Sequence, residues 1–472
     1  MVSLSERHNK RHGIGGAVLG IVVVVVIIVA ALAGYFAASS GISPSTTTST
    51  QYSTITQPAV TSTVTNTVGV TQTNTVTVSG TVTQTITGTA TTVTTTATQT
   101  TTSISTTTST ATVPHLPAAT LTVGGGTLVY PIMQDWISTY SYVQPNIQIT
   151  YNAVGSGTGI SNIAKGLYNF GESDAPLTAA QYASLPSGSN LLTVPISDSG
   201  IVPAYNLPGV TAHLNFTGNV LAEIFYGTIT AWNDPRIASL QSPSVASQLP
   251  NHAIQVYHRS DGSGTMYGFT QYLSDSNATW AKNVGFSTGT LAWPVGVGCL
   301  HNAGVAQCIA GNTYSIGPLE IAYEIANPGQ INYGAVKNAA GHYVLANLAD
   351  ISAALAAGVR NGLPSSPSQW SSYSVIQQTF NYTADATIYP ISTFTYALIY
   401  QSMSASYAAT TQAQATAVVN FLEWVITSGQ ATGPNDPTTT LGYPPLPQAA
   451  VSLSQSLLAS VTYNGTPVLS GS

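Results

Sequence analysis

The sequence predicts an α/β fold with largely parallel sheets, because short apolar runs typical of strands alternate with helical patterns along the chain. Three units support this prediction most strongly. In each unit an apolar run is followed by glycine and hydroxyl residues, which lead into a stretch with helical spacing of apolar side chains. The glycine-rich segments of these units are residues 124–127, 155–159 and 259–265. One design repeated three times favours a shared role over three unrelated turns.

The third segment, residues 259–265, reads Arg-Ser-Asp-Gly-Ser-Gly-Thr and follows a strand-like run at residues 254–257. Met266, Phe269 and Leu273 come next, with the spacing of one helical face. The glycines let the backbone approach a ligand closely, and the start of a helix adds a partial positive charge. For this segment alone, a simple turn that caps a helix remains the alternative interpretation.

The side chains of this segment suit an oxyanion. Arg259 offers a planar fork of donors that matches a tetrahedral anion, and Ser263 and Thr265 add hydroxyl donors. The segments 124–127 and 155–159 repeat the same combination of glycine and hydroxyl residues. Three helix N-termini that meet at one point would form an anion site built mostly from dipoles.

Asp174 stands near this predicted anion site, within the sequence Phe-Gly-Glu-Ser-Asp-Ala-Pro-Leu at residues 170–177. A carboxylate fits an anion site when the ligand carries a proton. Hydrogen phosphate has an O–H group that a carboxylate accepts, whereas sulfate has none and leaves the carboxylate unpaired. The alternative is that Asp174 caps a helix that starts at Pro176.

Composition excludes nucleic-acid binding and points to an extracytoplasmic protein. Charged residues make up only 5% of the 472, the formal net charge is −6, and no basic stripe is present. Residues 14–38 are apolar and exceed the ~20 residues that span a bilayer. The basic residues that flank this segment, Arg7, Lys10 and Arg11, all lie on its N-terminal side, which places that end in the cytoplasm and the rest outside. We expect a transmembrane anchor, with a cleaved signal segment as the alternative.

Residues 39–118 are rich in Thr and Ser and contain no Asp, Glu, Lys or Arg. Such a tract buries too little apolar surface to fold, so we expect a disordered stalk suited to O-glycosylation. The folded part is predicted to begin at residue 119. Four N-x-Ser/Thr sequons, at Asn215, Asn277, Asn381 and Asn464, indicate a glycosylated exterior.

The chain has two cysteines, Cys299 and Cys308, which are nine positions apart. Outside the cell this spacing predicts a disulfide that closes a small loop. His301 lies between them, but no fourth zinc ligand is evident. We therefore expect neither a metal nor a cofactor.

Enzyme motifs are weak in this sequence. Ser156 and Ser263 both lack the first glycine of a G-x-S-x-G nucleophile elbow. His258 stands beside Arg259 and could orient a serine, but a histidine at the end of a strand is more often structural.

Other apolar patterns complete the predicted architecture. Strands are predicted at residues 201–206 and 388–400, and helices at residues 218–226, 316–326, 349–357 and around 418–425.

Taken together, these residues resemble the phosphate-binding proteins of ABC-type phosphate importers, which are relatives of the periplasmic binding proteins. The resemblance covers roughly residues 121–428, and its strongest motifs are residues 170–177 and 259–265. Supporting motifs are residues 202–209, 232–235 and 293–296. The resemblance implies two α/β lobes with a ligand cleft between them, one formed by residues 119–200 and 389–472 and the other by residues 201–388.

The same resemblance implies a set of phosphate contacts, namely Thr127, the backbone of Leu128, Ser156, Asp174, Arg259, Ser263, Gly264 and Thr265. The family usually has an aromatic residue followed by a proline where this chain has Leu128 and Val129. A backbone N–H contact survives that change.

The function implied is that of an extracytoplasmic solute-binding protein, which captures inorganic phosphate and delivers it to an ABC permease in the membrane. We expect a monomer without enzymatic activity. A surface phosphate sensor or an adhesive module with the same fold is the first alternative, and a secreted phosphohydrolase is the second.

Overall fold

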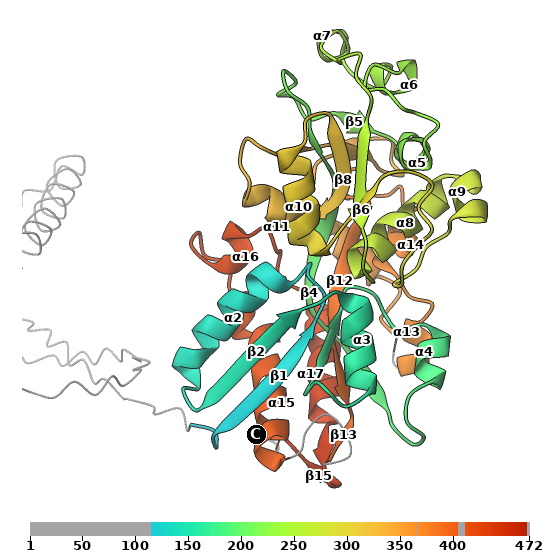
Figure 1. Ribbon diagram of the computed structural model, residues 1–472. Coiled ribbons are helices and arrows are strands. Elements are labelled where there is room, and N and C mark those ends of the chain that lie inside the picture. The colour runs from blue at the N-terminus through green and yellow to red at the C-terminus, as the bar shows by residue number, and fades with distance from the viewer. Residues whose placement is uncertain (1–114, 365, 405–410, 470–472) are drawn as a thin grey trace, which may run out of the picture. The chain divides into compact units, whose positions relative to one another are not determined.

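The structure is a computed structural model that describes residues 115–364, 366–404 and 411–469 (Figure 1). The predicted anchor at residues 14–38 and the predicted stalk as far as residue 114 lie outside the described residues. Within the described ranges, no helix is both long enough and apolar enough to cross a membrane.

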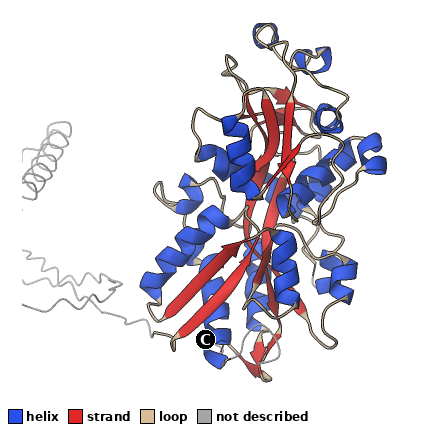
Figure 2. Ribbon diagram, in the orientation of Figure 1, coloured by secondary structure: helices blue, strands red, loops and turns tan. Residues whose placement is uncertain are grey.

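A mixed sheet of nine strands runs through the described part (Figure 2). Its order is β2-β1-β3-β12-β4-β8-β6-β7, and β9 pairs with β4. Its strands are β1 (Ala119–Gly125), β2 (Ile147–Ala153), β3 (Gly171–Ser173), β4 (Leu191–Asn206), β6 (Gln255–Arg259), β7 (Val297–Cys299), β8 (Ser315–Glu320), β9 (Asn332–Tyr333) and β12 (Ser392–Tyr400). One small sheet contains β5 (Asn215–Phe216), β10 (Ala335–Lys337) and β11 (Tyr343–Val344). A second small sheet contains β13 (Ser402–Met403), β14 (Thr462–Tyr463) and β15 (Thr466–Pro467).

Strand β4 connects the two halves of the large sheet. Its residues 191–200 pair with β12, and its residues 201–206 pair with β8. We call strands β2, β1 and β3 the β1 half, and strands β8, β6 and β7 the β6 half. The chain returns to the β1 half just before β12, where the carbonyl of Ile391 accepts a hydrogen bond of 2.8 Å from the amide of Ile201. The two crossings between the halves therefore lie side by side.

The predicted α/β class is confirmed, but the prediction of largely parallel sheets is wrong. β1 runs parallel to β2 and β3, and β6 runs parallel to β7 and β8. At the centre, however, β12 is antiparallel to β3 and β4, and β4 is antiparallel to β8. Both central strands are buried along almost their whole length, and a strand buried on both faces lacks the alternating pattern that usually marks an antiparallel strand.

Helices cover both faces of the sheet (Figure 2). The longer helices are α2 (Tyr130–Val143), α3 (Ser156–Ala164), α5 (Gly218–Tyr226), α8 (Gly264–Ser276), α10 (His301–Gly311), α12 (Leu348–Gly358), α15 (Gln412–Ile426) and α17 (Gln448–Ala459). The shorter ones are α4 (Ala179–Ala183), α6 (Pro235–Ala238), α7 (Pro243–Ala246), α9 (Ala278–Asn283), α11 (Ile321–Ile325), α13 (Pro367–Trp370), α14 (Val375–Thr379), α16 (Pro437–Thr440) and the 3₁₀ turn η1 (Ser428–Gln430).

The capping residues explain where several helices begin and end. Helix α5 begins after Thr217, whose hydroxyl accepts from the amide of Val220, and it ends at Gly227 with φ of 86°. Helix α4 begins after Thr178, which forms a capping box with Gln181. A helix does not start at Pro176, so the alternative that Asp174 caps such a helix is wrong.

The prediction of one helix at residues 316–326 is wrong. This segment forms strand β8 followed by helix α11. Gly317 and Pro318 oppose a helix at this point, because glycine is flexible and proline lacks an amide donor. Pro318 instead faces Pro203 of β4, in register. Glu320 ends the strand and caps α11 by accepting from the amide of Ala322 at 2.9 Å.

A disulfide joins Cys299, at the end of the edge strand β7, to Cys308 in α10. This bond fastens α10 to the edge of the sheet. The first residues of α10, next to this bond, reach the candidate site described below.

One continuous apolar core extends through both halves and includes Trp136, Trp232, Trp280 and Trp370, all at least 99% buried. Asp198 of β4 is fully buried in this interior, and neither of its carboxyl oxygens has a hydrogen-bond partner. Burial raises the pKa of Asp198 well above its ordinary value.

This carboxyl is predicted to make the fold less stable as pH rises. Between the unfolded pKa of about 3.9 and the raised native pKa, only the native state keeps the proton, so stability falls with increasing pH. The free energy of unfolding of Asp198→Asn, relative to wild type, should therefore increase by up to about 1.4 kcal/mol per pH unit in that window. Urea unfolding at a series of pH values measures this difference.

Asp385 provides a control of opposite sign. It accepts hydrogen bonds from the amide and hydroxyl of Thr387, which lower its pKa, so wild type gains stability at this position as pH rises. The free energy of unfolding of Asp385→Asn, relative to wild type, should therefore decrease as pH rises. A stability difference between wild type and Asp198→Asn that does not vary with pH would contradict the assignment.

Candidate anion-binding site

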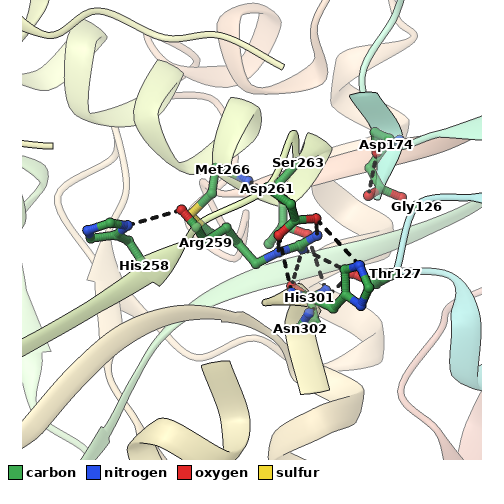
Figure 3. A network of polar contacts seen from close by, with 12 residues as sticks. Gly126, Thr127, Asp174, His258, Arg259, Asp261, Ser263, Met266, His301 and Asn302 are labelled. Carbon is green, nitrogen blue, oxygen red and sulfur yellow. Dashed lines mark hydrogen bonds and ion pairs between the residues drawn. The ribbon is translucent and has the colours of Figure 1, made fainter. Parts of the chain in front are cut away.

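The eight residues predicted to contact an anion all lie where strands end and helices begin. Thr127 and Leu128 lie between β1 and α2, Ser156 begins α3, Asp174 follows β3, Arg259 ends β6, and Ser263, Gly264 and Thr265 lie at the start of α8. The structure brings the eight together between the β1 half and the β6 half. Figure 3 labels four of them, Thr127, Asp174, Arg259 and Ser263. All eight are buried, with Arg259 the most exposed at 3%.

The guanidinium group of Arg259 crosses from the β6 half to the β1 half (Figure 3). Its Nε and Nη2 donate to the carboxylate of Asp261 at 2.7 and 2.5 Å. Its Nη1 donates to Thr127 Oγ1 at 3.0 Å and to Asn302 Oδ1 at 2.9 Å. The fork of Arg259 therefore binds Asp261 rather than facing an anion directly, and one Nη2 hydrogen has no acceptor among the described residues.

Asn302, in the first turn of α10, connects three parts of the site. Its side chain accepts from Arg259 and donates to Thr265 Oγ1 at 3.2 Å, and its amide donates to Thr127 Oγ1 at 3.2 Å. Thr127 Oγ1 thus accepts twice, from Arg259 and from Asn302. The hydroxyl hydrogen of Thr127 remains available to donate to a ligand.

Asp174 is the acceptor in this otherwise donor-rich site. Its carboxylate accepts from Ser156 Oγ at 3.2 Å and from Thr395 Oγ1 at 3.0 Å, and its amide donates back to Ser156 Oγ at 3.1 Å. Burial raises the pKa of Asp174, against the lowering effects of Glu172, Thr395, the Arg259 charge and Ser156.

Asp261 shows the opposite balance. Burial opposes its ionisation, but hydrogen bonds from Arg259 and the charge of that guanidinium outweigh burial and lower the pKa of Asp261. Arg259 and Asp261 therefore form an ion pair, whereas Asp174 is held by hydroxyl donors.

Glycines allow the two halves to approach this closely. A Cβ atom on Gly264 would lie 2.6 Å from Asp174 Cβ and 2.7 Å from Ser156 Oγ. A Cβ on Gly155, whose φ is 86°, would lie 2.4 Å from an Asp261 carboxyl oxygen. Larger side chains at either position would hold the halves apart.

Three consecutive backbone amides in the site have no acceptor among the described residues. They belong to Thr127, Leu128 and Val129, which are at most 2% exposed. Buried N–H groups are nearly always paired in folded proteins. These amides, the helix start at α2 and the hydroxyl of Thr127 together form a concentration of donors suited to an anion.

The sequence interpretation missed Asn302 and the role of Asp261. Asp261 lies inside the glycine-rich segment, and its position two residues after Arg259 was a signal for an ion pair. Asn302 gave a weaker signal, a polar residue at a helix start directly after a short strand. Thr395 gave none, because its role depends on β12 lying beside the end of β3.

The two histidines considered in the sequence lie outside the donor cluster. The ring of His258 stacks on Trp293 at 4.5 Å between centroids, and its Nδ1 lies 3.0 Å from the carbonyl oxygen of Arg259. His301 Nε2 lies 3.9 Å from the carboxylate of Asp261. Burial lowers the pKa of His301, although the charge of Asp261 opposes that effect.

Comparison with known proteins identifies the family of this chain. A model of the PBP superfamily domain matches residues 45–428. The phosphate-binding protein PstS of Pasteurella multocida is 34% identical over 335 residues, which cover 71% of this chain and 88% of the relative. PstS of Methanocaldococcus jannaschii is 33% identical over 313 residues, which cover 65% of this chain and 78% of the relative.

Solved structures show the same fold. A high-affinity periplasmic phosphate-binding protein (PfluDING), bound with phosphate, matches with a TM-score of 0.54 at 21% identity and covers 73% of this chain and 95% of its own. A human phosphate-binding apolipoprotein matches with a TM-score of 0.54 at 18% identity, over 71% of this chain and 93% of its own. The chain therefore belongs to the PBP superfamily and, within it, to the PstS family of phosphate-binding proteins.

Proposed function

We propose that this chain is the substrate-binding protein of an ABC-type phosphate importer and that it captures inorganic phosphate between the β1 half and the β6 half. It is a binding protein and not an enzyme. The observation that supports this function best is the buried group of donors around one acceptor, with the unpaired amides of residues 127–129 on one side and Arg259 on the other. The ligand contacts are the eight residues named above, from Thr127 to Thr265.

Asp174 makes this site selective for an oxyanion that carries a proton. Phosphate near neutral pH keeps at least one O–H group, which donates to the carboxylate of Asp174. Sulfate has no proton, so it would place an unpaired negative oxygen against that carboxylate. The donors of Ser156 and Thr395 hold Asp174 in place for this contact.

Phosphate must enter and leave by separation of the two halves, because every residue of the site is buried. The lobes are residues 119–200 with 389–472, and residues 201–388. The paired crossings at Ile201 and Ile391 are the natural hinge, since in this division the chain passes between the lobes there and the two crossings are hydrogen-bonded to each other.

The receptor works outside the cytoplasm, as substrate-binding proteins of this family do. A span at residues 14–38 holds it to the cell membrane, the Thr/Ser-rich stalk at residues 39–118 keeps the binding part away from the surface, and the folded part acts as a monomer that meets an ABC permease. The four sequons, at Asn215, Asn277, Asn381 and Asn464, carry glycans.

Calorimetry with phosphate, sulfate and a chromogenic phosphate ester tests the function. We expect tight binding of phosphate, much weaker binding of sulfate and no hydrolysis of the ester. Absence of phosphate binding in well-folded protein would reject the proposal.

Arg259→Lys is expected to weaken phosphate binding at least about tenfold without unfolding the protein. A lysine ammonium cannot hold Asp261, Thr127 and a ligand oxygen at once, and hydrogen bonds to charged groups are each worth about 1.5–3 kcal/mol. Arg236 is a control arginine, because it also forms ion pairs, with Glu223 and Asp234, but its side chain is 45% exposed and it lies outside the site. If Arg259→Lys and Arg236→Lys bind phosphate equally well, Arg259 has no part in binding.

Asp174→Asn is expected to shrink the preference for phosphate over sulfate. The amide keeps the shape of the carboxylate but can donate an N–H to sulfate, and its oxygen can still accept from phosphate. The ratio of the two affinities is the informative quantity, measured by competition. Asp135→Asn on α2, outside the site, serves as the control and should leave the ratio unchanged.

The wild-type preference should also relax on acidification, because a neutral carboxyl can donate to either anion. Burial raises the pKa of Asp174, so the midpoint should lie above the ordinary value of about 3.9. A variant Asp174→Asn that discriminates as strongly as wild type at every pH would show that Asp174 does not accept a proton from the ligand.

A further inference from the structure

Three tyrosine hydroxyls bind three consecutive carbonyl groups of the loop at residues 126–128. Tyr151 of β2 donates to the first carbonyl at 2.6 Å, Tyr323 of α11 to the second at 2.7 Å, and Tyr443, which precedes α17, to the third at 2.5 Å. These tyrosines are 8%, 9% and 0% exposed. Three phenols from distant parts of the chain thus converge on one short loop.

The geometry of the peptide bond gives this arrangement a directional effect. In a planar trans peptide, the N–H of a residue points away from the carbonyl of the residue before it. When the carbonyls of residues 126–128 are held by phenols, the amides of residues 127–129 are turned to the opposite side. Those are the three buried amides that have no acceptor among the described residues.

We propose that Tyr151, Tyr323 and Tyr443 are positioning residues of the anion site, a tyrosine clamp that holds the carbonyls of residues 126–128 away from the ligand and presents the amides of residues 127–129 to it. The inference rests on the proposed function and extends it to residues that do not touch phosphate. Without the clamp, a carbonyl of this loop could rotate towards the anion and repel it.

Two buried carboxyl groups extend the clamp. Tyr151 Oη lies 2.9 Å from Glu172 Oε2, and Tyr443 Oη lies 3.2 Å from Glu320 Oε2. A phenol has one hydrogen, and in both cases the shorter contact to a carbonyl uses it. An ionised carboxylate would then face the phenol oxygen with no hydrogen between them, so we assign Glu172 and Glu320 as neutral acids, with the proton of Glu172 also within reach of the Asp174 carboxylate.

The surroundings of both carboxyl groups favour the neutral form. Burial, followed by the charge of Asp174, raises the pKa of Glu172 well above its ordinary value, and burial raises the pKa of Glu320 to about 8. The titratable and charged groups around the pair are Tyr130, Tyr151, Asp174, Arg259, Tyr323 and Tyr443. An ionised Glu172 would compete with the loop carbonyl for the hydrogen of Tyr151, and it would add a second negative charge beside Asp174.

Phenylalanine substitutions test the clamp. Tyr151→Phe, Tyr323→Phe and Tyr443→Phe should each weaken phosphate binding about three- to tenfold, the equivalent of one neutral hydrogen bond. Tyr373→Phe is the matched control, since its buried hydroxyl also donates to a carbonyl, that of Gly358 at 3.2 Å, but outside the site. If the three variants bind phosphate as well as Tyr373→Phe does, the clamp has no role in binding.

The pH dependence separates positioning from simple structural support. Calorimetry with inorganic phosphate from about pH 5 to about pH 10 gives the ratio of the dissociation constants of wild type and Glu172→Gln, in which the titration of phosphate itself cancels. We expect this ratio to rise with pH, by up to about tenfold per unit once Glu172 ionises. A ratio that falls as pH rises would show that binding favours the ionised form of Glu172, and would overturn its assignment as a neutral acid.

Amide hydrogen exchange tests the clamp without any ligand. Exchange of the amides of residues 127–129 should be faster in each of the three clamp variants than in Tyr373→Phe, because the loop loses an anchor. Unchanged exchange would overturn the clamp even if phosphate binds. Faster exchange in a protein that does not bind phosphate would instead reject the proposed function and keep the clamp.

Discussion

The site depends on one buried positive charge. A guanidinium group without partners in the interior would destabilise the fold by several kcal/mol, so Arg259 requires acceptors on every side. Asp261 and Asn302 supply them from the same half of the sheet, and Thr127 supplies one from the other half. The hydrogen bond to Thr127 is made only when the halves are together, and one Nη2 hydrogen is left for a ligand. Contact between the halves is therefore linked to stabilisation of the buried charge.

Around this cation the chain places more acids than bases, which is unexpected for an anion site. Different contacts stabilise these acids. Asp261 is ionised and paired with Arg259, Asp174 accepts from hydroxyl donors, and Glu172 and Glu320 are buried against phenols. Neutral and paired groups leave little net charge to repel an anion. Most of the attraction then comes from oriented backbone and hydroxyl dipoles, in keeping with a chain that contains few charged residues.

Local sequence predicted most of the elements that carry the site, because glycine-rich turns between strand and helix are encoded within a few residues. Helix α3 and the start of α8 follow from such local patterns. The antiparallel placement of β4 and β12 could not be predicted, since it depends on which strands meet in space. The same limit applies to Thr395, Asn302 and the tyrosine clamp, whose partners lie up to 315 residues away. A polar residue with a distant partner has no local signature.

The unpaired amides of residues 127–129 also affect the protein when it is empty. If the halves close without an anion, three N–H groups lose water and gain no acceptor, at a cost of about 1–3 kcal/mol each. Under the proposed separation of the halves, the empty protein is biased towards an open arrangement, and a bound anion removes the bias. Any membrane partner that recognises the closed arrangement consequently distinguishes a loaded carrier from an empty one, without having to contact the cargo.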